Sequence, residues 1–341
     1  MTNLVKLSVT LSLIFSINNV YADREAFEST YVPLAPEKIV IQNASIYDGD
    51  GGEFFETDVL VEDGKIIAIG KDLPFSNEFR VIDATGKWVT PGIIDIHSHM
   101  GVYPAPGVRT SSDGNEATSP VTADVWAEHS IWVQDPQYAL ALTGGVTAFH
   151  ILPGSANLIG GRGVTVKNLQ RNTINSMKFP DAPHSLKMAC GENPKRVYGN
   201  RGQAPSTRMG NAAGYRKSWI QAEGYLRRLN EYEEKSDEAK ELEYAPTRDL
   251  EMETLAGVLK GEILVHNHCY RADEMATMID IAKEFNYKIT AFHHGVEAYK
   301  IADLLADNGI CGALWADWWG FKHEAYAVSY THLRAHETID D

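Results

Sequence analysis

The stretch Thr90-Pro91-Gly92-Ile93-Ile94-Asp95-Ile96-His97-Ser98-His99 decides the fold that the sequence predicts. Side chains alternate along a strand, so His97 and His99 face the same way at the end of the apolar run that begins at Ile93. Two imidazoles on one rigid element are suited to bind a divalent metal such as Zn²⁺. A lone His-x-His pair is often a chance pair, so its interpretation depends on the surrounding sequence.

Apolar runs and helical stretches alternate after this strand. Such alternation predicts a parallel sheet, either open or closed into a barrel. Helices are expected over residues 212–239 and 272–285. Residues 107–122 have the composition of a long loop, and loops that follow barrel strands commonly form the substrate site. The apolar runs lie at residues 93–96, 146–149, 186–189, 263–265 and 289–292.

A small all-β unit is expected before this alternating region. Residues 39–44 have the composition of a strand, and a turn-forming stretch follows at residues 47–52. Residues 59–69 predict a hairpin with the pair Asp63-Gly64 at its tip. Further short strands are expected over residues 81–84 and 87–89.

Histidines also end the later apolar runs. His266 ends one of them, with His268 two residues further on, and His294 follows the last run and precedes a glycine. The carboxyl ends of parallel strands meet at one mouth of a barrel. We therefore expect these side chains to lie beside the His-x-His pair.

Composition limits the kind of partner. The chain has 341 residues, a net charge of −15 and 44% hydrophobic residues. It is long enough for one barrel of roughly 250 residues and a smaller unit. The acidic balance argues against a nucleic-acid partner, because phosphate binding needs clustered Lys and Arg. The sequence leaves a homo-oligomer open.

The N-terminus has the pattern of a secretory signal peptide over residues 1–22. Lys6 precedes a short apolar run at residues 7–17, and Val20-Tyr21-Ala22 resembles a cleavage site. The run is too short to cross a bilayer comfortably, and no later segment is apolar over the length of a membrane span. We expect a mature protein that starts near Asp23 and is periplasmic or secreted.

The three cysteines are widely spaced and predict no disulfide framework. Cys190, Cys269 and Cys311 are separated by long stretches of other residues. One bridge is open to them in an oxidising compartment, but the pattern favours small buried hydrophobic residues.

The stretch quoted first resembles the opening barrel strand of the amidohydrolase superfamily, and residues 81–92 resemble the family's lead-in to it. The resemblance implies an α/β fold, a (β/α)8 TIM barrel with a small N-terminal β-sandwich-like domain. It implies that His97 and His99 bind one or two divalent ions, with zinc the first candidate. His266 and His294 would complete the metal shell, with His268 as a competitor for His266 or as a substrate contact.

A further ligand is expected in the middle of the barrel, where the family has an acidic or modified residue. Glu192 is favoured as a metal carboxylate, as in the deacetylase branch. Lys187 is the less favoured alternative, as a carboxylated bridging lysine of the prolidase-like branch. Glu192 also fits a helix cap or an ion pair with Lys195 or Arg196.

Three further stretches resemble secreted bacterial amidohydrolases grouped with imidazolonepropionase and prolidase-like enzymes. They are residues 191–199, 207–210 and 270–274. Arg196, Arg208 and Arg271, which lie within them, are candidates to bind a substrate carboxylate, although structural salt bridges are favoured for each.

The expected reaction is hydrolysis of a C–N bond in an amide, a cyclic amide or a dipeptide. A bound metal would lower the pKa of a water molecule toward ~7 and polarise the carbonyl oxygen. Two alternatives remain open. One is deamination of a cyclic amidine, which releases ammonia without a new carboxyl group, and the other is a barrel that binds without catalysis.

The family's catalytic base, an Asp after the eighth barrel strand, is not found. Asp317 lies too early to take that role, and residues 328–341 resemble read-through of a sequencing adapter rather than a native end. The expected units are residues 1–22, 23–89, 90–327 and 328–341, respectively the signal peptide, the β domain, a truncated barrel and a non-native tail. A barrel with only six or seven strands keeps exposed edges, so the chain as written is expected to be unstable and inactive.

Overall fold

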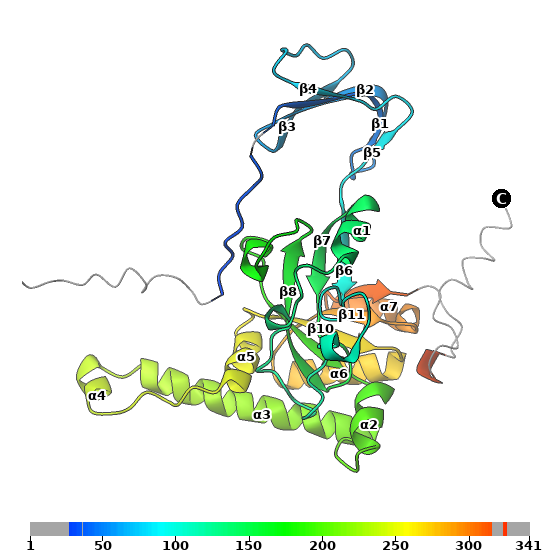
Figure 1. The fold of residues 1–341 in the computed structure, drawn as a ribbon. Coiled ribbons are helices and arrows are strands. Elements are labelled where there is room, and N and C mark those ends of the chain that lie inside the picture. The colour runs from blue at the N-terminus through cyan, green and yellow to red at the C-terminus, as the bar shows by residue number, and fades with distance from the viewer. Residues whose placement is uncertain (1–26, 36, 316–322, 326–341) are drawn as a thin grey trace, which may run out of the picture.

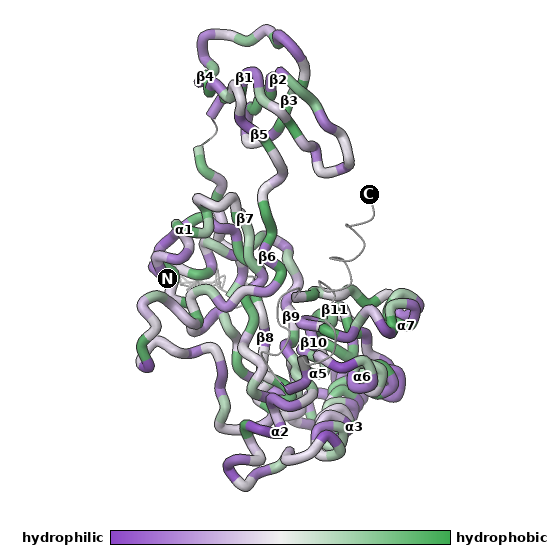
Figure 2. The backbone as a smooth tube through the Cα atoms, turned by 90° about the vertical axis from the view of Figure 1, so that its right-hand side faces the viewer, coloured by the Kyte–Doolittle hydropathy of each residue, from purple (hydrophilic) through white to green (hydrophobic). Residues whose placement is uncertain are grey.

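A computed structural model describes residues 27–35, 37–315 and 323–325. A small sheet is formed by residues 39–89, and a larger, curved sheet with helices follows it (Figure 1). Figure 2 shows the same two parts from the side. The predicted signal peptide and the predicted non-native tail lie outside the described residues.

The small sheet has five strands in the order β3-β2-β1-β4, with β5 also pairing with β1. The hairpin expected over residues 59–69 is confirmed, since β2 and β3 are antiparallel. Asp63 and Gly64 between them have φ values of 51° and 72°, which a two-residue hairpin turn requires. The strands are β1 Ile39–Tyr47, β2 Glu53–Glu62, β3 Lys65–Gly70, β4 Arg80–Asp83 and β5 Trp88–Val89.

Among the described residues, the larger sheet has seven strands that follow one another in chain order. It curls so far that His97 on its first strand reaches His293 on its sixth, with 2.8 Å between their Nδ1 atoms. The expected barrel is therefore confirmed as a nearly closed sheet, with seven strands in the described part of the chain. The strands are β6 Ile93–Ser98, β7 Val146–Ile151, β8 Ile159–Lys167, β9 Ser185–Ala189, β10 Leu264–Cys269, β11 Ile289–His294 and β12 Cys311–Leu314.

One strand departs from the expected parallel arrangement. β8 runs antiparallel to both β7 and β9, whereas the other neighbouring pairs are parallel. The connection over residues 152–158 contains no helix and is too short for a parallel crossover, which needs about a dozen residues. Because β8 reverses once on each side, β9 again points the same way as β7. The carboxyl ends of the six remaining strands thus share one mouth.

Helices cover the outside of this sheet. The helix expected over residues 212–239 is divided, because α3 ends at Glu233 and the Ser236 side chain caps a separate α4. The helix expected over residues 272–285 is confirmed as α6. The helices are α1 Gln137–Thr143, α2 Glu192–Gly199, α3 Arg208–Glu233, α4 Asp237–Glu241, α5 Leu250–Leu259, α6 Ala272–Glu284 and α7 Ala302–Asp307. Short 3-10 turns lie at Arg109–Ser111, Ala127–His129, Ile174–Ser176, Ala298–Ile301 and His323–Ala325.

The main hydrophobic core lies between β9 to β11 and helices α3, α5 and α6. Trp219, Leu255, Val265 and Phe292 are fully buried there. Alternate residues of these strands therefore face the helices, and the residues between them face the barrel interior. The interior is thus free to hold polar side chains.

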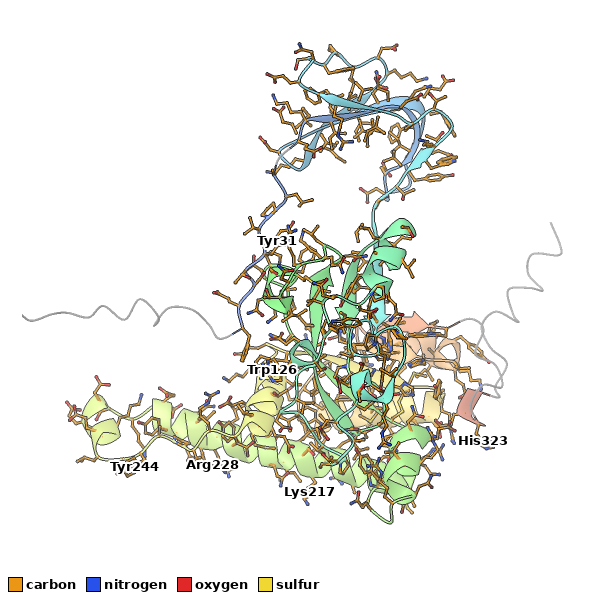
Figure 3. The ribbon with its side chains drawn as sticks, viewed as in Figure 1. Tyr31, Trp126, Lys217, Arg228, Tyr244 and His323 are labelled. Atoms are coloured by element: carbon orange, nitrogen blue, oxygen red, sulfur yellow. A yellow bond between two sulfur atoms is a disulfide. The ribbon has the colours of Figure 1, made fainter. Side chains whose placement is uncertain are left out.

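Two segments lie outside this core. The far end of α3 and α4 projects from the barrel, with Arg228 and Tyr244 along it (Figure 3). The segment before β1 lies along the barrel, where the Thr30 backbone N–H donates to the Asn175 carbonyl at 2.9 Å.

None of the helices in the described part of the chain is long and apolar enough to span a membrane.

The expectation that the cysteines are simply buried hydrophobic residues is wrong. Cys190 and Cys269 form a disulfide with 5.2 Å between their Cα atoms, and Cys311 is exposed. Ala189 and His268 are register partners on β9 and β10, so the residues that follow them lie side by side. Spacing along the chain does not show this pairing, because strand register creates it.

Candidate metal centre

Seven histidines form a connected group at the barrel mouth, which we name the histidine cluster. Each ring of the cluster lies within 5.0 Å of at least one other, measured between centroids. The predicted site histidines are therefore brought together. The members are His97, His99, His150, His266, His268, His293 and His294.

Strand register explains why these side chains meet. Lys187 on β9 pairs with His266 on β10, and His268 on β10 pairs with His293 on β11. Side chains of register partners in parallel strands point to the same face. Because the sheet curls, His97 on β6 approaches the same group from the opposite wall.

Lys187 lies in the interior with this cluster. Only 1% of the residue is exposed, and its Nζ donates to the Pro153 carbonyl oxygen at 2.9 Å. Burial lowers the pKa of Lys187 from 10.5 to about 7, because an ammonium group loses its hydration there. At neutral pH the Lys187 amine is therefore neutral in a large fraction of the molecules.

Five histidines of the cluster, on strands β6, β7, β10 and β11 and just after β6, have pKa values below physiological pH and are neutral there. Burial, followed by the positive charge of Lys187, lowers the pKa of both His99 and His150 to about 4. Burial and the neighbouring His150 lower the pKa of His266 to about 3. Burial also lowers the pKa of His97 and of His293 far below the ordinary range. Neutral imidazole is the form that binds metals.

Hydrogen bonds distinguish a ligand-like histidine from a structural one. His99 Nδ1 lies 2.8 Å from the Leu152 carbonyl oxygen, so this nitrogen carries the proton and Nε2 keeps a lone pair. Metal-binding histidines commonly have such a backbone partner. His150 instead uses Nε2 with the Ser185 hydroxyl at 2.7 Å and also hydrogen bonds to the Ile96 backbone. His150 is therefore suited to a structural role.

The donor set fits a divalent metal in its chemistry. Buried neutral nitrogen donors are what zinc and related ions prefer. In the described part of the chain, however, no three His, Cys, Asp or Glu side chains surround a common point where an ion would sit. The ring nitrogens of His97, His293 and His266 are hydrogen bonded to one another instead.

His294 adopts a backbone conformation that is rare for residues other than glycine, with a φ of 72°. The His294 ring stacks on Trp315 with 4.2 Å between centroids, and its centroid is also 4.2 Å from that of His268. Trp315 also contacts the His97 ring edge-on at 4.8 Å. The aromatic ring of Trp315 therefore covers part of the cluster.

Glu192 lies at the start of α2 and is half-buried. Its backbone N–H donates to Glu324 Oε2 at 3.0 Å, and among the described residues its carboxylate forms no hydrogen bond or ion pair with the cluster. The next residue, Asn193, instead reaches His268 Nε2 at 3.2 Å and Ser155 Oγ at 2.9 Å. A metal-binding role for Glu192 stays a prediction.

The predicted substrate-binding arginines lie outside the cluster. Arg208 Nε is 3.1 Å from a Glu274 carboxylate oxygen, and its Nη2 pairs with Glu324. Arg271 pairs with Asp273 at 2.6 Å. Arg196 is exposed. Arg208 and Arg271 thus have the structural ion pairs that were favoured for them.

Sequence reasoning missed His150 and His293. His293 directly precedes the His294-Gly295 pair, and the family resemblance drew attention to the second histidine of that run. The doubled histidine was a usable signal. His150 ends the apolar run that forms β7, and no local pattern marks it.

Replacing Gly191 with alanine is expected to lower the free energy of unfolding by about 2 kcal/mol. Gly191 has a φ of 78°, and an added Cβ would lie 2.4 Å from Glu324 Oε2, whose side chain is only 1% exposed. Urea unfolding measures the change. Gly224→Ala in α3 is the control, because its Cβ meets no close contact, and alanine should stabilise this helix by ~0.5–1 kcal/mol. Equal effects at both glycines would contradict the expected clash.

Comparison with known proteins identifies the family. No family model matches the chain. The crystal structure of an amidohydrolase from Thermotoga maritima MSB8 is 36% identical, with a TM-score of 0.77, and the match covers 87% of this chain and 76% of that one. The chain belongs to the amidohydrolase superfamily, which confirms the interpretation from its sequence.

Curated relatives extend beyond the region they share with this chain. Amidohydrolase tasK from Hapsidospora irregularis is 36% identical in an alignment over 302 residues that covers 82% of this chain and 30% of the relative. Dihydroorotase from Lactobacillus helveticus (strain DPC 4571) is 46% identical over 74 residues, or 22% of this chain and 16% of that protein. The chain spans less than a third of the length of either relative.

Proposed function

We propose that the protein is a metal-dependent hydrolase that cleaves a C–N bond in an amide or cyclic amide, dipeptides included. The observation that carries the proposal is the cluster of buried and partly buried histidines around Lys187 at the mouth of an amidohydrolase barrel. Membership of the superfamily supports the reaction class.

His97, His99, His266 and His294 would between them hold one or two divalent ions, for which zinc is the first choice because the donors are imidazole nitrogens. When bound, such a metal supplies a Lewis acid that polarises a carbonyl group and lowers the pKa of water. His150 is left out because both of its ring nitrogens have other partners. We assign no catalytic base among the described residues.

Lys187 is our preferred middle ligand, ahead of Glu192. A neutral lysine amine attacks CO₂, forms an N–C bond and releases a proton, which yields a carbamate with two oxygen donors. The burial of Lys187 and its pKa of about 7 favour the neutral amine that this step needs. Its register pairing with His266 places it beside a proposed ligand.

The contacts around the cluster favour separate roles for His268 and Trp315. The amide of Asn193 donates to His268 Nε2, which orients that ring at the mouth. Trp315 shields His97 and His294 on one side, which reduces the access of water to the reacting groups. His268 is therefore proposed as a substrate contact rather than a metal ligand.

We also propose that the protein works in the periplasm or is secreted. The leader-like pattern of residues 1–22 supports export. The disulfide between Cys190 and Cys269 supports an oxidising compartment, since such bonds are rare where thiols are kept reduced.

Metal analysis tests the proposed site directly. We expect zinc to co-purify with the wild-type chain, and His97→Ala to lower its metal content at least tenfold. His129→Ala is the matched control, because this histidine lies outside the cluster and is about half exposed. Equal metal content in wild type and His97→Ala would remove the proposal.

The reaction class is tested with the metal-loaded protein. New carboxyl groups from amide, cyclic amide and dipeptide substrates would support hydrolysis of a C–N bond. Release of ammonia without a new carboxyl group would instead support deamination of a cyclic amidine.

A further inference from the structure

We infer that His293 is a positioning residue that couples His97 to His266, so that only one of these two histidines at a time can present its Nε2 lone pair to a metal. The inference rests on the proposed metal site and concerns a residue outside the proposed ligand set. It bears on whether the site takes one ion or two.

The coupling starts from two contacts made by one ring. His293 Nδ1 lies 2.8 Å from His97 Nδ1, and His293 Nε2 lies 2.8 Å from His266 Nδ1. Both distances are hydrogen-bond distances. His293 is 1% exposed and is held in place by its register with His268 and Ala313. A single buried ring therefore joins β6 to β10 across the barrel.

Counting protons on the three rings gives the constraint. A neutral imidazole has one N–H donor and one acceptor nitrogen. If His293 donates from Nδ1, His97 accepts on Nδ1 and carries its own proton on Nε2. His293 then accepts on Nε2 from His266 Nδ1, which leaves the lone pair on His266 Nε2. If His293 donates from Nε2 instead, the roles of His97 and His266 are exchanged.

In either arrangement, one of the two outer histidines, His97 or His266, has a lone pair on Nε2, and the other has an N–H group there. An ion bound at Nε2 of His97 would keep the proton on Nε2 of His266, and the converse holds equally. A second ion can bind the opposite end only if a buried hydrogen bond breaks. We therefore expect one tight ion and a second that binds about tenfold more weakly, the factor that corresponds to one lost hydrogen bond.

The first experiment needs no metal. The full chain is labelled with ¹⁵N-histidine, and long-range ¹H–¹⁵N correlations report which ring nitrogen carries the proton. The twelve histidines are assigned with single His→Gln variants. We expect opposite tautomers at His97 and His266 in wild type. The same tautomer at both positions would overturn the coupling.

The second experiment measures zinc binding by calorimetry in the wild type and two variants. His293→Gln keeps one donor and one acceptor, so the gap of about tenfold between the two ions should persist. His293→Leu removes both, and the gap should close to within about threefold. Two ions of equal affinity in wild type, or loss of the first ion in His293→Leu, would overturn the inference, the latter because His293 would then be a ligand.

The two experiments separate this inference from the proposed function. Absence of zinc binding in the wild type would end the proposed metal site, while the tautomers of the metal-free protein would still decide the coupling. Circular dichroism of each variant shows that its fold is intact before binding is compared.

Discussion

Replacing Lys187 with methionine is expected to raise the free energy of unfolding of the metal-free protein by about 3 kcal/mol at pH 7. Lys187 is 1% exposed, and no carboxylate of the described residues is paired with it, so its charge is costly in the folded state. Methionine has a similar length and carries no charge. The same substitution should abolish metal binding if Lys187 is the middle ligand.

The magnitude follows from the pKa of this lysine. Burial lowers the pKa from 10.5 in the unfolded chain to about 7 in the fold. Each tenfold change in this equilibrium corresponds to ~1.4 kcal/mol, which sets an upper limit near 5 kcal/mol. Methionine also gives up the hydrogen bond to the Pro153 carbonyl, so the expected gain is smaller than this limit.

The pH dependence gives the sign of the effect. Between about pH 7 and pH 10.5 the unfolded chain binds more protons at Lys187 than the folded chain does, so wild-type stability rises with pH in this window. Below about pH 7 both states are protonated and this contribution is constant. The advantage of Lys187→Met should therefore be largest below pH 7 and vanish toward pH 10.5.

Urea unfolding from pH 6 to pH 10 measures this advantage. Lys217→Met is the matched control, because Lys217 lies on the exposed face of α3 (Figure 3) and should change stability by less than ~0.5 kcal/mol. A loss of stability in Lys187→Met would contradict the buried-charge argument.

The disulfide between Cys190 and Cys269 is expected to contribute about 4 kcal/mol to the free energy of unfolding. It closes a loop with a sequence separation of 79 residues, which restricts the unfolded chain strongly. It also joins the ends of β9 and β10, which carry Lys187 and His266. The double variant Cys190→Ala/Cys269→Ala should therefore unfold at lower denaturant and bind zinc more weakly.

Thiol titration and guanidinium unfolding check this prediction. One reactive thiol is expected in the denatured wild type and three after reduction, since Cys311 is free. Cys311→Ala is the control, because Cys311 is exposed on β12 and should leave both stability and zinc affinity unchanged. Equal stability of the double variant and the wild type would contradict a structural role for the bond.

These two expectations act in opposite directions on the same part of the barrel. The buried Lys187 lowers the stability of the fold at the point where the proposed carbamate requires a neutral amine, and the nearby disulfide raises that stability. Functional sites commonly contain such costly groups, which the surrounding structure holds in place.

The sequence predicted the parts of the fold that depend on local patterns. The His-x-His strand, the Asp63-Gly64 hairpin and α6 each follow from spacing, turn chemistry or helical periodicity. The order of His97, His266 and His294 along the chain also predicted their meeting at one mouth, because parallel strands bring their carboxyl ends together.

The reversal of β8 and the division of α3 from α4 were not predicted. Both depend on short connections, over residues 152–158 and 234–236, whose path is decided by packing rather than by periodicity. The composition of residues 212–239 favours a helix throughout, so the prediction ran one helix across the break at residues 234–236.

By itself, the sequence determined which side chains are available for chemistry and the strands that carry them. Only the tertiary structure decided how they are connected. Strand register placed Lys187 beside His266, and the curl of the sheet brought His97 to His293. Register likewise paired Cys190 with Cys269. These contacts join residues far apart in the chain, so their partners depend on the relative shift of neighbouring strands and on sheet curvature, which no local pattern encodes.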